Sequence, residues 1–116
     1  MDTKLYRYLD DIAWRPHPVA DGVTIKPLVT KRGDKAEVSC LLVKIEAGRE
    51  VPVHIHEDSD DIIFPLSGEA SMFIEGMETL ELKEGMIVRV PKGTKHKIFN
   101  VTKDLLLYDV FSPATI

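Results

Sequence analysis

Short apolar stretches alternate with turn residues along almost the whole chain. They are rich in Val, Ile, Leu and Phe, and Gly, Pro or charged residues separate them. Such short, evenly spaced runs predict an all-β sandwich or barrel. The expected strands cover residues 23–29, 36–45, 51–56, 61–67, 70–75, 79–82, 86–90, 95–101 and 105–111.

The 116 residues are enough for one hydrophobic core. We expect an N-terminal arm at residues 1–22, a barrel at 23–112 and a short tail at 113–116. The arm holds the one helical candidate, a turn at residues 4–11. The stretch 14–22 is too rich in proline and polar residues to be regular, and we expect it to lie across the barrel or against a partner subunit.

Strand alternation selects which polar residues face inward. Successive side chains of a strand point to opposite faces, so His54 and His56 share one face. In the last expected strand, Leu105, Leu107, Asp109 and Phe111 share a face, which places a carboxyl among apolar neighbours. Asp109 is therefore an interior candidate.

A pair of histidines two residues apart can direct both imidazoles to one point. His96, on a strand-like segment after a Pro-Gly turn, is the natural third ligand. Imidazole suits Zn, Fe, Ni and Cu, and carboxylate oxygen also suits Mn. Three histidines and one carboxylate leave positions open for water or substrate, as in catalytic rather than structural sites. Taken alone, the pair is equally consistent with two ordinary strand histidines.

The spacing around these histidines is more specific than the pair itself. Residues 48–68 follow the pattern G-x5-H-x-H-x4-D-x6-G, and residues 85–100 follow G-x5-P-x-G-x2-H-x3-N. The two segments resemble the paired motifs of the cupin superfamily. The one departure is Asp61, which stands where the family usually has Glu.

The resemblance implies a small antiparallel β-barrel of jelly-roll type, with a metal inside one mouth. His54, His56 and His96 would bind a divalent transition metal, Fe, Mn, Zn or Ni, with Asp61 as the fourth ligand. Small cupins usually form homodimers by exchanging N-terminal strands, and the N-terminal segment is consistent with that.

Two acids, Asp61 and Asp60, are candidates for the carboxylate ligand. Asp61 matches the family position when counted from both His56 and Gly68. Asp60 would need a one-residue slip, which would turn the strand over. Asp58, Asp60 and Asp61 are alternatively a solvated acidic loop, in which case three histidines would hold the metal alone. Pro65 further predicts an edge or a bulge in this strand.

The C-terminal "YDVFSPATI" resembles a group of small cupins that process unsaturated uronates from pectin and alginate. The segment 13–23 is similar to the corresponding N-terminal part of that group. The resemblance implies that Asp109 and Phe111 face the pocket, with Asp109 as a proton donor or acceptor beside the metal. Asp109 is alternatively a buried structural acid. The group carries an arginine where this chain has Thr115, so the anion anchor for a uronate is missing.

Two further polar residues have competing interpretations. Arg89 lies in the middle of an expected strand and either binds a substrate carboxylate in the pocket or points outward to solvent. His17 lies in a proline-flanked loop and is expected to be exposed.

Net charge and composition limit the classes of binding partner and the compartments that the sequence favours. The net charge of −4 argues against nucleic-acid binding. No apolar run approaches the length of a membrane span, and the N-terminal residues lack the apolar core of a signal peptide. The single Cys40 permits no intrachain disulfide, which fits a cytoplasmic protein.

The sequence leaves several functions open. The first is an enzyme of the isomerase or lyase type, in which the metal acts as Lewis acid on a sugar acid or keto acid. An Fe-dependent dioxygenase is a close variant. The second is a barrel that binds or senses a small metabolite without chemistry, and the third is a metal-free barrel. Fold alone does not decide between them.

Overall fold

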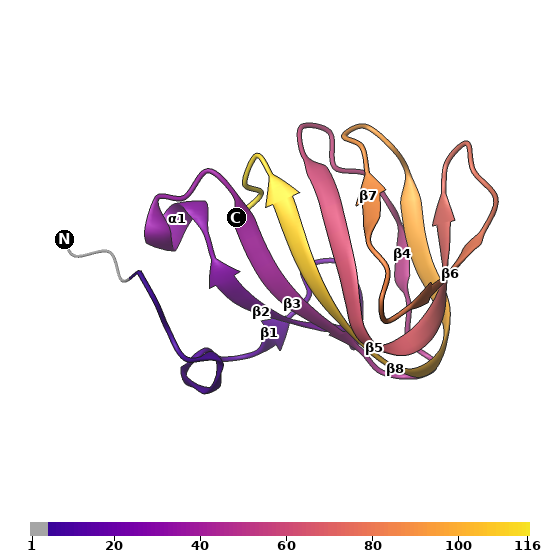
Figure 1. The fold of residues 1–116 in the computed structure, drawn as a ribbon, viewed down its shortest axis with the longest axis horizontal. Coiled ribbons are helices and arrows are strands. Elements are labelled where there is room, and N and C mark those ends of the chain that lie inside the picture. The colour runs from indigo at the N-terminus through magenta and orange to yellow at the C-terminus, as the bar shows by residue number, and fades with distance from the viewer. Residues whose placement is uncertain (1–4) are drawn as a thin grey trace.

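The computed structural model describes residues 5–116 as a curved antiparallel sheet with almost no helix (Figure 1). The strands, in chain order, are β1 Arg15–Pro16, β2 Thr24–Val29, β3 Ser39–Ile45, β4 Val51–His54, β5 Asp60–Ile74, β6 Leu80–Lys83, β7 Val88–Val90 and β8 His96–Ser112. A 3-10 turn, η1, spans Leu9–Asp11, and one short helix, α1, spans Lys31–Asp34. The predicted all-β class is confirmed.

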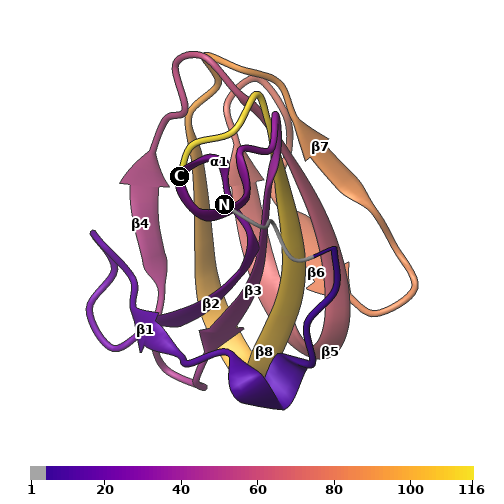
Figure 2. The same cartoon turned by 90° about the vertical axis from the view of Figure 1, so that its left-hand side faces the viewer.

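Two long strands, β5 and β8, hold the fold together. The first half of β5 pairs with the second half of β8, between β3 on one side and β7 on the other. The second half of β5 pairs with the first half of β8, between β6 and β4. Both strands therefore curve from one layer into the other, and the two layers enclose the core (Figures 1 and 2).

The prediction of separate strands at 61–67 and 70–75, and at 95–101 and 105–111, is wrong. Each pair is one continuous strand. Pro65 and Gly68 do not end β5. The pairing of β5 with β8 shifts register at Pro65–Ser67 and again before Ser71, and it continues on both sides of these shifts. The bulge predicted at Pro65 is confirmed, and bulges are a usual way for a strand to bend around a barrel.

Alternation along β8 places the functional residues inward. Leu105, Leu107, Asp109 and Phe111 are all buried, as predicted. In the first half of the strand, His96 and Ile98 are buried, but Asn100 is exposed. Asn100 has a positive φ of 50°, which shifts the alternation, so that Val101 faces the core instead.

Both ends of the described chain lie against the barrel. In the N-terminal arm, β1 pairs with β2, although no regular structure was expected there. Buried Lys26 donates to the carbonyl of Leu9 and lies over the Trp14 ring, which holds the arm in place. Of the helical turn expected at residues 4–11, only the 3-10 turn η1 is present in the described residues, which exclude Lys4.

The C-terminal end is held by Ser39. The hydroxyl of buried Ser39 accepts hydrogen bonds from the backbone amides of Thr115 and Ile116.

Gly68 occupies a position that no side chain can share. Its φ is +95°, and an added Cβ would lie 2.2 Å from the backbone oxygen of Asp104. Gly76 also has a positive φ, +84°, but an added Cβ would meet nothing within 4 Å. An alanine at Gly76 would therefore meet only backbone strain, whereas an alanine at Gly68 would meet the same strain and a steric clash.

We predict that Gly76→Ala lowers the free energy of unfolding by about 1 kcal/mol, the cost of left-handed backbone. Gly68→Ala also forces the β5–β8 backbones apart and should cost about 3 kcal/mol or more. Urea unfolding measures both values. Equal losses in the two variants would contradict the close strand approach at Gly68.

Candidate metal centre

Three histidines converge at one mouth of the barrel. His54 ends β4 and pairs directly with His96, the first residue of β8. Their ring centroids lie 4.1 Å apart, and His56, two residues further along the chain, lies 5.0 Å from His54. One ring nitrogen from each residue can be chosen so that all lie within 4.8 Å of one another. The cluster predicted from the sequence is therefore assembled in the fold.

Backbone carbonyls orient two of these rings. Nδ1 of His54 lies 2.8 Å from the carbonyl oxygen of Pro52, and Nδ1 of His96 lies 2.9 Å from that of Thr94. A carbonyl oxygen only accepts, so each Nδ1 carries the proton and donates it. Each Nε2 therefore has a free lone pair, which is the arrangement that metal-binding histidines adopt.

The cluster fits a metal ion on independent grounds. Nε2 of His96 is buried and has no hydrogen-bond partner among residues 5–116. Burial lowers the pKa of His54, and burial lowers the pKa of His56 to about 4, although the nearby Asp61 carboxylate opposes the shift. Both rings are thus neutral near pH 7, as a metal ligand requires. A divalent cation would occupy the unsatisfied lone pairs.

Asp61 lies beside the histidines, and Asp60 does not. The Asp61 Oδ2 atom lies 3.4 Å from Nε2 of His96 and 3.8 Å from Nε2 of His56. Asp60 faces the other way, where its carboxylate accepts from the Arg89 side chain and the Lys92 amide. The solvated-loop interpretation does not hold for Asp61, which is only 3% exposed.

Arg89 does not line the pocket. Its side chain is 62% exposed, and it forms an ion pair with Asp60 at 3.0 Å. In the β5–β7 ladder Arg89 pairs with Ile62, whose side chain points to the face opposite that of Asp61. The Arg89 side chain therefore lies on the outer face of the sheet. The pocket role considered for Arg89 is contradicted by this placement, and the outward-facing alternative matches it.

A second carboxyl group lies next to Asp61. In the β5–β8 ladder Asp61 pairs with Phe111 and Ile63 with Asp109, so Asp61 and Asp109 are diagonal neighbours on the inner face. Burial, together with the adjacent Asp61 carboxylate, raises the pKa of Asp109 well above its ordinary value. Burial also raises the pKa of Asp61, but the Asp109 hydrogen bond and the neighbouring histidines outweigh it and lower the pKa overall.

The two carboxyls therefore differ in how readily they ionise. The pKa of Asp109 is raised and that of Asp61 is lowered, so Asp109 is the partner that holds a proton more firmly. Like charges so close together cannot both stay ionised in a buried site. One oxygen of each carboxyl, Oδ1, has no hydrogen-bond partner in the described part of the chain. The site thus contains a buried acid beside a buried base.

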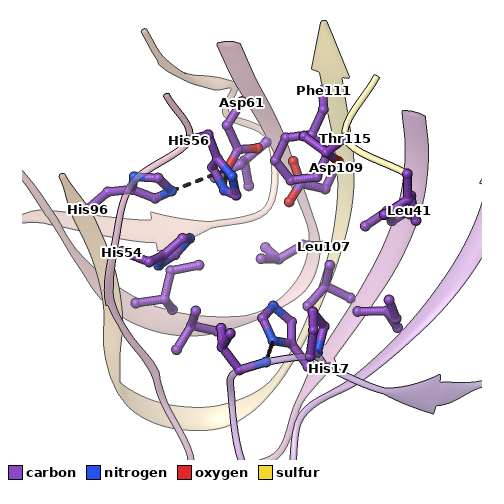
Figure 3. Close-up of a pocket in the computed structure, with 18 of the residues that line it drawn as sticks. His17, Leu41, His54, His56, Asp61, His96, Leu107, Asp109, Phe111 and Thr115 are labelled. Atoms are coloured by element: carbon purple, nitrogen blue, oxygen red, sulfur yellow. Dashed lines mark hydrogen bonds and ion pairs between the residues drawn. The ribbon is translucent and has the colours of Figure 1, made fainter. Parts of the chain in front are cut away.

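A cavity of about 340 Å³ opens onto these groups (Figure 3). Its wall is mostly apolar, and the Phe111 ring packs against the His56 ring with centroids 4.7 Å apart. The lining includes Phe111 and Asp109, as the sequence resemblance implied, and also His17, Thr115 and Ile116.

Sequence reasoning missed His17, which was expected to be exposed. It is half-buried and lines the cavity. His17 lies in a loop, where no strand alternation marks which side chains turn inward. The sequence therefore carried no periodic signal for it.

The comparison with known families is decisive for classification. The family described as "Cupin domain" (Cupin_2) matches residues 41–111, more than half of the chain. The chain belongs to the Cupin_2 family. Its predicted jelly-roll barrel is confirmed by the cupin structures that superpose on it.

Solved structures of other cupins cover nearly the whole chain. KdgF from Halomonas sp. is 27% identical, covers 90% of this chain and 90% of its own, and superposes with a TM-score of 0.76. A predicted oxalate decarboxylase from Thermotoga maritima is 22% identical and covers 94% of this chain and 99% of its own, with a TM-score of 0.81. At that identity the second similarity shows the fold alone.

A curated relative from Streptomyces coelicolor, itself uncharacterised, is 41% identical over 54 residues. The alignment covers 47% of this chain and 50% of the relative, so the chain spans about half the length of that protein. Between residues 5 and 116, no helix has the length and apolar content needed to cross a bilayer.

We predict that Asp61→Asn lowers the affinity for Co²⁺ by about 10- to 100-fold, the usual cost of losing a carboxylate that holds or orients a metal-ligand set. The matched variant Asp60→Asn should stay within about twofold of wild type, because its exposed ion pair with Arg89 contributes little. Titration followed by the cobalt visible spectrum measures both. His54→Ala serves as the positive control and should lose stoichiometric binding. Loss of affinity in Asp60→Asn with none in Asp61→Asn would reverse the assignment.

Proposed function

We propose that the protein is a metal-dependent enzyme that moves a proton on a small oxygenated substrate, as an isomerase or lyase. His54, His56 and His96 would hold a divalent transition metal (Fe, Mn, Zn or Ni), with Asp61 as the fourth ligand. When bound, such a metal polarises a carbonyl or hydroxyl oxygen as a Lewis acid. The observation that carries the proposal is the pair of buried carboxyls, Asp109 and Asp61, in the wall of a largely apolar cavity beside the three histidines.

Asp109 is the proposed proton carrier. Its raised pKa favours the protonated form that a proton donor needs, and after giving up the proton it can act as a base. Oδ1 of Asp109 has no hydrogen-bond partner among residues 5–116, and Asp109 lines the cavity, so a substrate atom could supply the missing partner. The apolar wall excludes water, which would otherwise exchange the proton and screen the charges.

The substrate class is supported by the resemblance of the C-terminal segment to uronate-processing cupins and by the similarity to KdgF from Halomonas sp.. That support extends to a carbonyl compound with neighbouring oxygens, such as a keto acid or keto sugar. A proton moved between carbon and oxygen of such a compound interconverts keto and enol forms, which is the chemistry that one acid–base pair can perform.

A barrel that binds a metabolite without chemistry is the second candidate. The largely apolar wall favours it, since such walls are typical of pockets that retain a ligand by burial. In that case Asp109 is a structural acid. Replacing it would change the affinity for the ligand, and neither wild type nor variant would turn any compound over.

We also propose a homodimer that uses the N-terminal arm. Leu5, Tyr6 and Tyr8 are 95%, 77% and 73% exposed, and three large exposed apolar side chains within four residues are typical of an interaction surface.

We predict that Asp109→Asn lowers turnover by about 100-fold or more, because the variant keeps the shape of the carboxyl but cannot exchange its proton. Metal content and melting temperature should stay near those of wild type. The assay screens keto-uronates, 2-oxo acids and uncharged ketones by NMR in D₂O, which reports both product formation and exchange of enolisable hydrogens. Dioxygen consumption is recorded in parallel, since it would reveal a dioxygenase.

Asp58→Asn provides the matched control, because Asp58 is an exposed acid of the loop before β5. Its turnover should equal that of wild type. If turnover is found and Asp109→Asn retains all of it, Asp109 is not the proton carrier. If no compound in the panel turns over or exchanges while several bind, the binding function is supported instead.

A further inference from the structure

His17 is held rigidly in the loop between β1 and β2. Its backbone amide donates to the carbonyl of Val23 at 2.8 Å. Its Nδ1 atom accepts from the amides of Val19 and Ala20, at 3.1 and 3.0 Å. Ala20 and Val23 are themselves buried, so these bonds anchor the ring to the core.

These bonds determine the tautomer of His17. A backbone N–H can only donate, so Nδ1 must carry the lone pair and Nε2 must carry the proton. The ring lines the cavity, and Figure 3 shows it across the open space from Asp61 and His56. No partner for Nε2 is present among residues 5–116. His17 therefore offers a fixed, neutral N–H donor to whatever occupies the cavity.

The other side chains of the cavity restrict what this donor can meet. Apart from the three clustered histidines and the two carboxyls, the lining within the described chain is apolar except for His17 and Thr115. No lysine or arginine of residues 5–116 lines it. A carboxylate or phosphate placed away from the metal centre would be buried without a counter-charge, which is costly. A ketone, ether or hydroxyl oxygen would need only one hydrogen bond.

We propose, on the basis of the function proposed above, that His17 is a substrate-binding residue whose Nε2–H donates to an uncharged oxygen of the substrate. The substrate then has a metal-binding oxygen at one end, an apolar middle, and a neutral acceptor at the other. Any negative charge is confined to the metal-binding end. This excludes a sugar acid whose carboxylate points away from the metal, and it agrees with Thr115 standing where the uronate-processing cupins carry arginine.

The test uses straight-chain hydroxamic acids of six, seven and eight carbons as probes. The hydroxamate group binds the metal, and three versions of each chain end differently: in an unmodified alkyl terminus, in a ketone at the penultimate carbon, or in a carboxylate. Isothermal titration calorimetry on the metal-loaded protein gives their affinities. At one chain length or more, we expect the ketone to bind about three- to tenfold tighter than the alkyl probe, the range of one neutral hydrogen bond. The carboxylate should bind weaker than the alkyl probe at every length.

His17→Asn is the matched variant. The asparagine side-chain oxygen can accept from the amides two and three residues ahead, as Nδ1 does, so the loop keeps its anchor. The variant lacks an N–H at the position of Nε2. Affinity for the alkyl probes should stay within about twofold of wild type, and the preference for the ketone should disappear. His17→Phe, which keeps the ring volume, should also lose the preference.

Each outcome is informative. If alkyl hydroxamates bind but no ketone is preferred at any length, or if His17→Asn keeps the preference, the role of His17 is refuted while the metal-dependent function stands. If a carboxylate probe binds tightest, the exclusion of a distal charge is refuted. If metal-loaded protein binds no hydroxamate at all, the open metal site fails, and the inference about His17 fails with it.

Discussion

The pairing of β8 with its three neighbours is the constraint on which the candidate site depends. β8 contributes His96 near its start and Asp109 and Phe111 near its end. Its partner β4 brings His54 opposite His96, and its partner β5 brings Asp61 opposite Phe111. A slip of one residue in either ladder would turn a ligand to the outer face. The curvature of β8 brings these contributions to a common cavity, and the β5–β8 approach at Gly68 is part of that curvature.

Burial determines the electrostatics of the site. The same apolar surroundings lower the pKa values of His54 and His56 and raise that of Asp109, whereas the groups around Asp61 lower its pKa against the effect of burial. Within residues 5–116, buried polar atoms on Asp61, His96 and Asp109 have no hydrogen-bond partner. Such unsatisfied atoms cost stability, and they gather at one point of the molecule. This concentration is typical of a functional site rather than of a structural core.

Much of this arrangement could be predicted from the sequence, because motif spacing and strand alternation are local properties. The spacing matched the cupin motifs, and that resemblance selected His54, His56, His96 and Asp61, while alternation placed Asp109 and Phe111 on one inner face. The errors arose where tertiary contacts decide. Pro65 and Gly68 resemble a strand break, yet pairing with β8 carries β5 through them. His17, expected to be exposed, is turned inward by hydrogen bonds within its loop, and no linear pattern shows that constraint. For Arg89 the sequence left two placements open, and its exposed ion pair with Asp60 matches the outward one.

X-ray absorption spectroscopy of the zinc-loaded protein tests whether His54, His56 and His96 bind one metal ion together. We expect three imidazole nitrogens at about 2.0–2.1 Å, with the multiple-scattering features of histidine, and oxygen in the remaining positions. A bound zinc surrounded by oxygen alone, or by fewer than two imidazoles, would show that the three histidines are not the metal site. So would a protein that retains no stoichiometric metal after reconstitution.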